Sequence, residues 1–185
     1  MSSPVDPARN PWVRRSRRTV YENAWIEVMH DEVVRPDGTD GVYGVVAFRD
    51  RAVGIVPVAN DGQILLVGQF RYTIEEYSWE IPEGGVPPTE DPLTGAKREL
   101  AEETGFTASS WRMLVPRFSL SNSVGDQTGC IYVASELTPG AADPEPTEEI
   151  ALRWVTIDEG LAMIDEGAIN DSVTQVGLLR YALER

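Results

Sequence analysis

Short runs of apolar residues alternate along this chain with segments whose apolar residues recur at the period of a helix. The short runs end at turn residues, which is typical of β-strands, and Asn60-Asp61-Gly62 has the composition of a hairpin turn between two of them. The predicted strands cover residues 20–34, 42–48, 52–59, 63–72, 111–120, 129–134 and 150–157. Strands interleaved with helices predict an α/β fold in which helices flank a mixed sheet.

Three helices are predicted from the residues at their ends. Asp91 offers an N-cap, Pro92 suits the first helical position, and Gly105 is a C-terminal stop signal. The pattern Thr156-x-x-Glu159 resembles a capping box that opens a short helix. The three predicted helices cover residues 92–104, 156–166 and 171–183.

The length of the chain fits one main domain with a short N-terminal extension. It has 185 residues, of which 42% are apolar, and this is enough for one sizeable core. We expect an N-terminal arm and small β unit over residues 1–48 and the main domain over residues 49–185. A single His and a single Cys exclude a disulfide framework, a Cys/His zinc site and a dithiol mechanism.

The charge of the chain is strongly negative, except near the N-terminus. Sixteen Lys and Arg against 30 Asp and Glu give a net charge of -14, which disfavours binding to nucleic acid or to an anionic membrane. No apolar stretch approaches the length of a membrane span. The Arg-rich N-terminal arm is either a loosely packed tail or a segment that docks on the acidic surface of a partner subunit. No secretion signal follows it, so we expect a cytoplasmic protein.

Three glutamates on the first predicted helix suggest a cation site. Glu99, Glu102 and Glu103 are spaced i, i+3 and i+4, so they share one face of the helix. A Glu-rich face is often merely solvated, but like charges at this spacing raise one another's proton affinity unless a cation lies between them. In a chain with one histidine, hard carboxylate oxygens favour Mg²⁺, or Mn²⁺ in its place, over zinc or copper.

The spacing around these glutamates resembles that of the Nudix hydrolase family. Gly84 is followed after five residues by Glu90, and after seven more by Arg98-Glu99-Leu100-x-Glu102-Glu103-x-Gly105-Phe106. This run matches every position of the Nudix box. The resemblance implies a Nudix α/β/α sandwich that cleaves a nucleoside diphosphate linked to another group, with water attacking one phosphorus.

The resemblance also implies a role for each residue of the box. Glu99 and Glu103 match the principal metal ligands, Glu102 matches a further ligand or an orienting group, and Glu83 contributes its backbone carbonyl. The residues expected to have structural roles are Gly84 and Gly105 at turns, Arg98 beside a box carboxylate, and Glu90 in the loop.

The residues before the box resemble the branch of the family that hydrolyses ADP-ribose and nucleoside diphosphate sugars. The runs Gln69-Phe70-Arg71-Tyr72 and Trp79-Glu80-Ile81-Pro82-Glu83-Gly84-Gly85 carry this likeness, as does a β unit before the main domain. It implies that Arg71 contacts the diphosphate, although a surface ion pair is the simpler alternative. The aromatic residues that could stack on the base, or else belong to the core, are Tyr21, Trp25 and Trp79.

Two later loops hold further candidates. Residues 119–127 resemble the loop that frames the sugar or terminal phosphate, which makes Ser121 and Asn122 candidate substrate contacts. The general base in this branch is commonly a glutamate on a later loop. Its candidates are Glu149 and Glu148, ranked nearly equal, and then Glu145.

The predicted function is therefore Mg²⁺-dependent hydrolysis of ADP-ribose or a nucleoside diphosphate sugar to a nucleoside monophosphate and a sugar phosphate. Similar proteins are dimers whose N-terminal units exchange, so a homodimer is expected. One alternative is a nucleoside triphosphate pyrophosphohydrolase, which would release pyrophosphate. Another is a Nudix-fold sensor that binds a nucleotide without cleaving it, and this is disfavoured because such a module needs no full set of box carboxylates.

Overall fold

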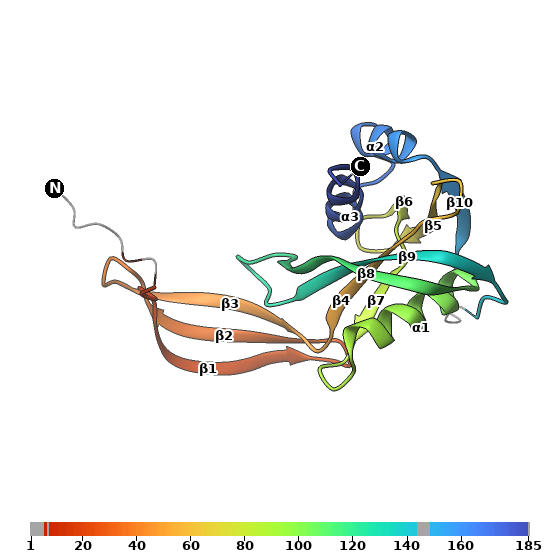
Figure 1. Cartoon of the computed structure of the whole chain (residues 1–185). Helices are drawn as coiled ribbons and strands as arrows, with labels where there is room; N and C mark the ends of the chain where they lie inside the picture. The colour runs from red at the N-terminus through yellow and green to blue at the C-terminus, as the bar shows by residue number, and fades with distance from the viewer. Residues whose placement is uncertain (1–5, 7, 144–148, 185) are drawn as a thin grey trace. The chain divides into compact units, whose positions relative to one another are not determined.

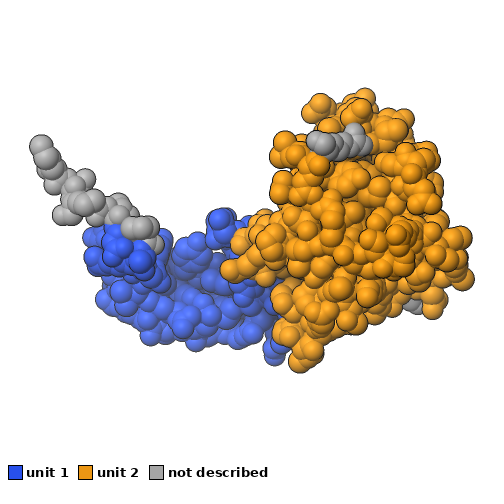
Figure 2. All heavy atoms as spheres, in the orientation of Figure 1, with its two compact units in different colours: residues 1–49, 121–126 blue, residues 50–120, 127–185 orange. Residues whose placement is uncertain are grey.

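The structure is a computed structural model and describes residues 6, 8–143 and 149–184. The chain divides into two compact units (Figure 2). Residues 1–49 and 121–126 form the first, named here the N-terminal unit, and residues 50–120 and 127–185 form the second, named the main unit. The sequence placed residues 121–126 in the main domain, so their membership of the N-terminal unit differs from the prediction.

The N-terminal unit contains an antiparallel sheet with the strand order β1-β2-β3 (Figure 1). Its strands are β1 Val13–Glu22, β2 Ile26–Val34 and β3 Asp40–Phe48. The single strand predicted over residues 20–34 is wrong, because the chain turns at Asn23. The side chain of Asn23 accepts hydrogen bonds from the backbone N–H groups of Trp25 and Ile26 at 2.9 and 2.8 Å. Every residue of β1 is exposed, so no apolar alternation marked it in the sequence.

Residues 121–126 cover part of the free edge of β3. The Val46 N–H donates to the Val124 carbonyl at 2.9 Å, and the Asp126 N–H donates to the Val46 carbonyl at 3.2 Å. The Asp126 carboxylate also accepts a hydrogen bond from the Phe48 N–H at 2.9 Å. These bonds explain why the loop belongs to the N-terminal unit although it lies far from that unit in sequence.

The main unit contains two sheets, with the strand orders β7-β4-β9-β8 and β10-β5-β6 (Figure 1). Its strands are β4 Arg51–Pro57, β5 Ile64–Arg71, β6 Glu76–Glu80, β7 Glu83–Val86, β8 Phe106–Ser119, β9 Thr128–Pro139 and β10 Ala151–Val155. β4 pairs in parallel with β9 and antiparallel with β7. The prediction of an α/β fold with a mixed sheet is therefore confirmed.

The strands on either side of Asn60-Asp61-Gly62 do not form the expected hairpin. The tight turn is present, with a left-handed φ of 85° at Gly62. However, β4 and β5 belong to different sheets, and a single isolated bridge joins Val58 to Ile64. β4 is already paired on both sides, with β7 and with β9, so it offers no free edge to β5.

The predicted helices are confirmed as α1 Pro92–Thr104, α2 Ile157–Asp165 and α3 Ser172–Ala182. The predicted caps are confirmed as well. Asp91 caps α1 at its start, and Gly105 closes it with a left-handed φ of 73°. Thr156 and Glu159 form both hydrogen bonds of the capping box that opens α2.

Helices cover both faces of the four-stranded sheet (Figure 1). Successive residues of a strand point to opposite faces. Val53 and Ile55 of β4 pack with Ala96 and Leu100 of α1, whereas Val56 of β4 belongs to the apolar cluster that contains α2 and α3. This arrangement gives the α/β/α layering. Of the helices that the structure describes, none is both long and apolar enough to span a bilayer.

Candidate active site

The Glu99 carboxylate lies against Gly84, where α1 faces β7. A Cβ placed on Gly84 would lie 2.1 Å from the carboxyl carbon of Glu99. Any side chain at this position would therefore displace the carboxylate, and this explains on steric grounds why the box has glycine here.

Arg98 links these carboxylates to the loop before α1. Its Nη1 lies 2.8 Å from Glu99 Oε1 and 2.9 Å from Glu102 Oε2. Its Nη2 donates a hydrogen bond to the Gly85 carbonyl at 3.0 Å and lies 3.6 Å from Glu90 Oε2. One guanidinium thus offsets the repulsion between two glutamates and ties the helix to the loop.

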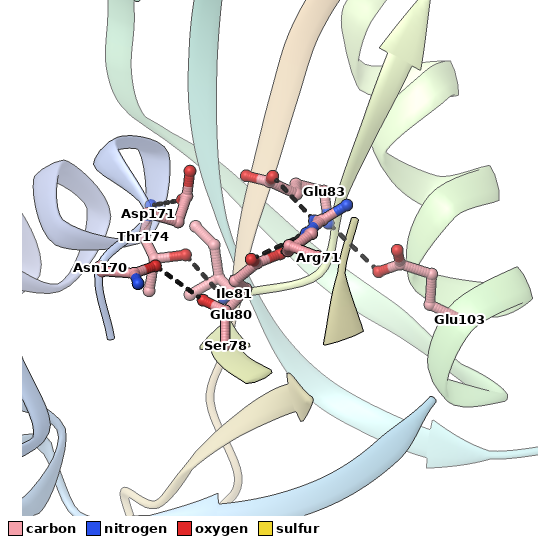
Figure 3. Close-up of polar contacts among 9 residues, drawn as sticks. All are labelled: Arg71, Ser78, Glu80, Ile81, Glu83, Glu103, Asn170, Asp171 and Thr174. Carbon is pink, nitrogen blue, oxygen red and sulfur yellow. Dashed lines mark hydrogen bonds and ion pairs between the residues drawn. The ribbon is translucent and has the colours of Figure 1, made fainter. Parts of the chain in front are cut away.

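Glu103 joins α1 to the start of β7. It is 4% exposed, and its Oε2 accepts a hydrogen bond from the Glu83 N–H at 3.2 Å (Figure 3). The Glu83 side chain carries a buried oxygen, Oε2, that has no hydrogen-bond partner within the described ranges. Burial raises the pKa of Glu83 well above its usual value, and the carboxylates of Asp171 and Glu80 add to the effect.

The residues around Glu83 suit a hard divalent cation. Their donors are carboxylate and carbonyl oxygens, which Mg²⁺ and Mn²⁺ prefer. An unpartnered buried carboxylate oxygen on Glu83 fits such an ion, and so does the space that Gly84 leaves for Glu99. No group of three or more Asp, Glu, His or Cys side chains is assembled as a metal centre in residues 6, 8–143 and 149–184. Glu99, Glu102 and Glu103 stay predicted ligands on the spacing of the box.

Arg71, at the end of β5, meets two carboxylates (Figure 3). Its Nε donates to the two oxygens of Glu80 at 2.9 and 3.1 Å, and its Nη2 also donates to Glu80. The same Nη2 lies 3.4 Å from Glu83 Oε1. Its hydrogen bonds with Glu80 raise the pKa of Arg71 above its usual value, so the guanidinium stays charged. The sequence left open a surface ion pair for Arg71. Arg71 does form an ion pair, but its partner Glu80 is buried.

The start of α3 holds the chain between Glu80 and Glu83 (Figure 3). Thr174 Oγ1 accepts a hydrogen bond from the Ile81 N–H at 3.0 Å, and both groups are buried. The Asp171 carboxylate in turn accepts a hydrogen bond from the Thr174 N–H at 2.7 Å. A helix cap therefore also supports the strand connection that carries the two glutamates.

No role was predicted from the sequence for Glu80 or Thr174. Glu80 lay inside the run that suggested the ADP-ribose branch, and a charged residue between two apolar ones was the available signal. For Thr174 the sequence showed only a position in the first turn of a helix. The residue that it contacts lies 93 positions earlier in the chain.

Trp79 has a packing role in this structure. The Arg153 guanidinium lies 5.6 Å from the centre of its ring, and the Tyr77 ring meets it edge to face at 5.7 Å. The ring also packs against the apolar cluster of α2 and α3. These contacts give the ring partners within the protein, and its stacking on a base stays a prediction.

Glu149 lines a cavity of about 510 Å³ together with Gln69, Phe70 and Tyr77. The lining of this cavity does not include Arg71, Glu83 or any carboxylate of α1. The structure therefore places Glu149 near β5 and β6 without bringing it together with the box. Glu148 and Glu145 lie outside the described residues.

The other predicted substrate contacts belong to the N-terminal unit. Tyr21 and Trp25 are 55% and 71% exposed, so both rings are accessible on that unit. Ser121 and Asn122 are exposed in the segment 121–126, which hydrogen-bonds to the edge of β3. The part of these four residues in substrate binding stays a prediction.

Comparison with known families assigns both parts of the chain. The NUDIX domain model matches residues 48–174. A second model, the nucleoside diphosphate sugar hydrolase N-terminal domain, matches residues 12–46.

Similar proteins of known name cover most of the chain. A methanol dehydrogenase activator from Bacillus methanolicus is 31% identical over 89% of this chain and 89% of its own. An ADP-ribose pyrophosphatase from Mycobacterium tuberculosis is 32% identical over 89% of this chain and 80% of its own. The crystal structure of an ADP compounds hydrolase superposes with a TM-score of 0.84, at 21% identity, over 96% of this chain and 95% of that one. The last likeness concerns the fold alone.

Proposed function

The chain belongs to the Nudix hydrolase family, and from this premise we propose that it hydrolyses the diphosphate of ADP-ribose or of a nucleoside diphosphate sugar. The products are a nucleoside monophosphate and a sugar phosphate. The observation that carries the proposal is the position of Arg71, a charged guanidinium 3.4 Å from Glu83 at the start of the box. The match of residues 12–46 and the name of the mycobacterial relative support this substrate class.

The site has the groups that diphosphate cleavage needs. Phosphoryl transfer requires charge neutralisation on the phosphate oxygens and a positioned water more than covalent help from the protein. Glu99, Glu102, Glu103 and the Glu83 carbonyl would hold the metal, and Mg²⁺ or Mn²⁺ supplies charge neutralisation and an activated water when bound. Arg71 binds the diphosphate from the β5 side.

A glutamate outside the box is proposed as the general base, and the candidates are Glu149 and Glu148. The base acts only as the proton of the attacking water leaves in the transition state. Glu149→Gln or Glu148→Gln should therefore lower kcat with little change in substrate affinity. Wild-type kcat in both variants would place the base elsewhere, with Asp126 or Glu102 as the next candidates.

We also propose a homodimer in which the N-terminal strands cross to the second subunit and Trp25 lies near the partner's Arg71. The N-terminal unit supports this proposal because it leaves large apolar side chains exposed. The most exposed of them are Trp25, Val13, Val42, Tyr21 and Val124. Light scattering at micromolar concentration should give the mass of two chains, and a fully active monomer would contradict the proposal.

One panel of substrates tests the function. Purified protein with Mg²⁺ is offered ADP-ribose, several nucleoside diphosphate sugars and the nucleoside triphosphates, and the products are separated by chromatography. A nucleoside monophosphate with a sugar phosphate is expected. Release of pyrophosphate from a triphosphate would favour the sanitation activity. Binding without any turnover would favour a sensor.

A further inference from the structure

Glu80 is a charged residue in an environment that ordinarily excludes charge. It is 2% exposed. Within the described residues, Arg71 donates all the hydrogen bonds that the Glu80 carboxylate accepts. A carboxylate buried to this extent requires a partner, because an unpaired charge is costly in a protein interior. Hydrophobic residues of similar volume would fill the space without this requirement.

The pair leaves one side of the guanidinium available. Arg71 binds Glu80 through Nε and Nη2, the side-on geometry, and within the described residues its Nη1 makes no hydrogen bond. The Arg71 side chain is 35% exposed. Since a guanidinium is planar and rigid, fixing the Nε side also fixes the direction of the Nη1 hydrogens.

The support of Glu80 is itself held in place. The next backbone N–H, that of Ile81, is bonded to Thr174, which is fully buried. Two residues earlier, the Ser78 hydroxyl donates to the Asn170 side chain at 3.2 Å. The chain is thus attached on both sides of Glu80 to the segment that opens α3.

We propose that Glu80 is the positioning residue of Arg71: it holds the guanidinium by its Nε side so that Nη1 is presented to the diphosphate of the substrate. This inference rests on the proposed function. It also identifies what Glu80 prevents. The nearest other carboxylate to Arg71 is Glu83, whose Oε1 already accepts a hydrogen bond from Nη2 at 3.4 Å, and a guanidinium released from Glu80 would pair with Glu83 alone and lose its fixed direction toward the diphosphate.

The test is a double-mutant cycle with Glu80→Gln, Arg71→Ala and the double variant. Glu80→Gln keeps the size of the side chain and removes its charge. We expect KM to rise about tenfold or more with a smaller change in kcat, and Arg71→Ala to lose about 10²-fold in kcat/KM. If Glu80 acts through Arg71, the double variant loses no more kcat/KM than Arg71→Ala alone. Losses that multiply, or wild-type kinetics in Glu80→Gln, would overturn the proposal.

Two further variants separate positioning from stability. Glu184→Gln is the control, since it removes two other Glu–Arg pairs of the main unit, with Arg112 at 2.7 Å and with Arg180 at 3.0 Å, and its KM should be that of the wild type. Glu80→Asp keeps the charge on a shorter side chain, so its KM should lie between that of Glu80→Gln and that of the wild type. If Glu80→Gln fails to fold, the cycle is run with Glu80→Asp.

The cycle can be read independently of the substrate assignment. It is measured on whichever diphosphate the wild type cleaves, so an unexpected substrate would count against the proposed function alone. Calorimetric titration of the same four proteins with inorganic pyrophosphate and Mg²⁺ gives the double-mutant cycle from binding affinities instead of kinetics. Coupling between Glu80 and Arg71 in that titration supports the positioning role even if no sugar nucleotide is cleaved. Independent effects refute it, and a wild type that neither cleaves nor binds contradicts both proposals.

Discussion

Each unit of this protein contains a buried carboxylate held by an arginine through two hydrogen-bonding nitrogens. In the N-terminal unit, Arg17 Nε and Nη2 donate to the two oxygens of Asp31, both at 2.6 Å. In the main unit, Arg71 holds Glu80 through the same two nitrogens. Both carboxylates are almost fully buried, and both arginine side chains are about one third exposed.

The two pairs differ in their surroundings. Arg17 and Asp31 stand directly opposite each other on β1 and β2, and the pair serves as a cross-strand contact. Arg71 has a second carboxylate, Glu83, within ion-pair distance. Glu83 is joined through its backbone to Glu103 on α1, so acidic groups outnumber the arginine here.

We therefore expect the same chemical pair to be structural in one unit and, if the proposed function holds, part of the site in the other. A balanced pair satisfies both charges and leaves nothing for a ligand. A group with surplus carboxylates around one arginine favours a divalent cation and, through that cation, an anionic substrate. If this surplus, rather than the pair itself, makes the site, removing a surplus charge and removing the balanced pair should affect activity differently.

Removing the metal should have the largest effect. We expect no hydrolysis in excess chelator and recovery on adding Mg²⁺ or Mn²⁺, because the box glutamates cannot hold an anionic diphosphate without a cation between them. Product formation is followed before and after the metal is restored. Undiminished hydrolysis in chelator would contradict the metal assignment.

Glu103→Gln should cost at least ~10²-fold in kcat, since it removes one charge from the surplus while keeping the shape of the side chain. Asp31→Asn is the matched change in the N-terminal unit, where a buried carboxylate also becomes an amide. It should leave kcat near the wild-type value and lower only stability. Similar kcat values for the two variants would remove the distinction between the regions.

Arg17→Ala and Arg71→Ala should destabilise the protein to a similar extent. Each leaves a buried carboxylate without its partner, a change that costs about 3 kcal/mol of unfolding free energy. Urea denaturation measures this loss. Only Arg71→Ala should also raise KM, because Arg17 forms no ion pair other than that with Asp31 within the described residues. A large KM change in Arg17→Ala would show that the N-terminal pair has a part in substrate binding.

Thr174→Val tests the support of the chain between Glu80 and Glu83. Valine has nearly the shape of threonine but cannot accept the Ile81 N–H, and a buried donor left without a partner costs about 2 kcal/mol. Thr174→Ser keeps the hydroxyl and is the control. Equal stability of the valine and serine variants in thermal unfolding would mean that this hydrogen bond contributes little.

Local signals in the sequence predicted the helices of this fold well. Caps are set by residues within one turn of the helix end, so Asp91, Gly105 and Thr156 could be recognised without tertiary information. Strand pairing could not be recognised in this way. Gly62 predicts a turn, but whether the flanking strands pair depends on β7 and β9, which lie far away in the chain.

The same division applies to the candidate site. The spacing of Glu99, Glu102 and Glu103 along one helix was readable, because it is a local property. The burial of Glu80, its hydrogen bonds to Arg71 and the contact between Ile81 and Thr174 arise when distant segments pack. The packing contacts of Trp79 with Arg153 and Tyr77 are likewise invisible in the sequence.

The smallest expected effect concerns the pH dependence of the N-terminal pair. Hydrogen bonding to Arg17 holds the pKa of Asp31 below its usual value, although burial opposes this. In the unfolded chain the carboxylate has its ordinary pKa of about 3.9, so that state binds a proton more readily than the folded one. The pair therefore contributes its full stability above this pH and loses it as the pH falls toward the lower pKa of the folded state.

The contribution of the pair is isolated by comparing wild type with Asp31→Asn, which cannot titrate at this position. We expect the wild type to be more stable at pH 6 by about 1 kcal/mol and this advantage to shrink between pH 5 and about pH 3. Urea unfolding of both proteins across this range measures it. Other carboxylates titrate in the same range, but they do so in both proteins and cancel in the difference. A difference that stays constant down to pH 3 would show that the charge of Asp31 does not stabilise the fold, and the pair would then owe its place to packing alone.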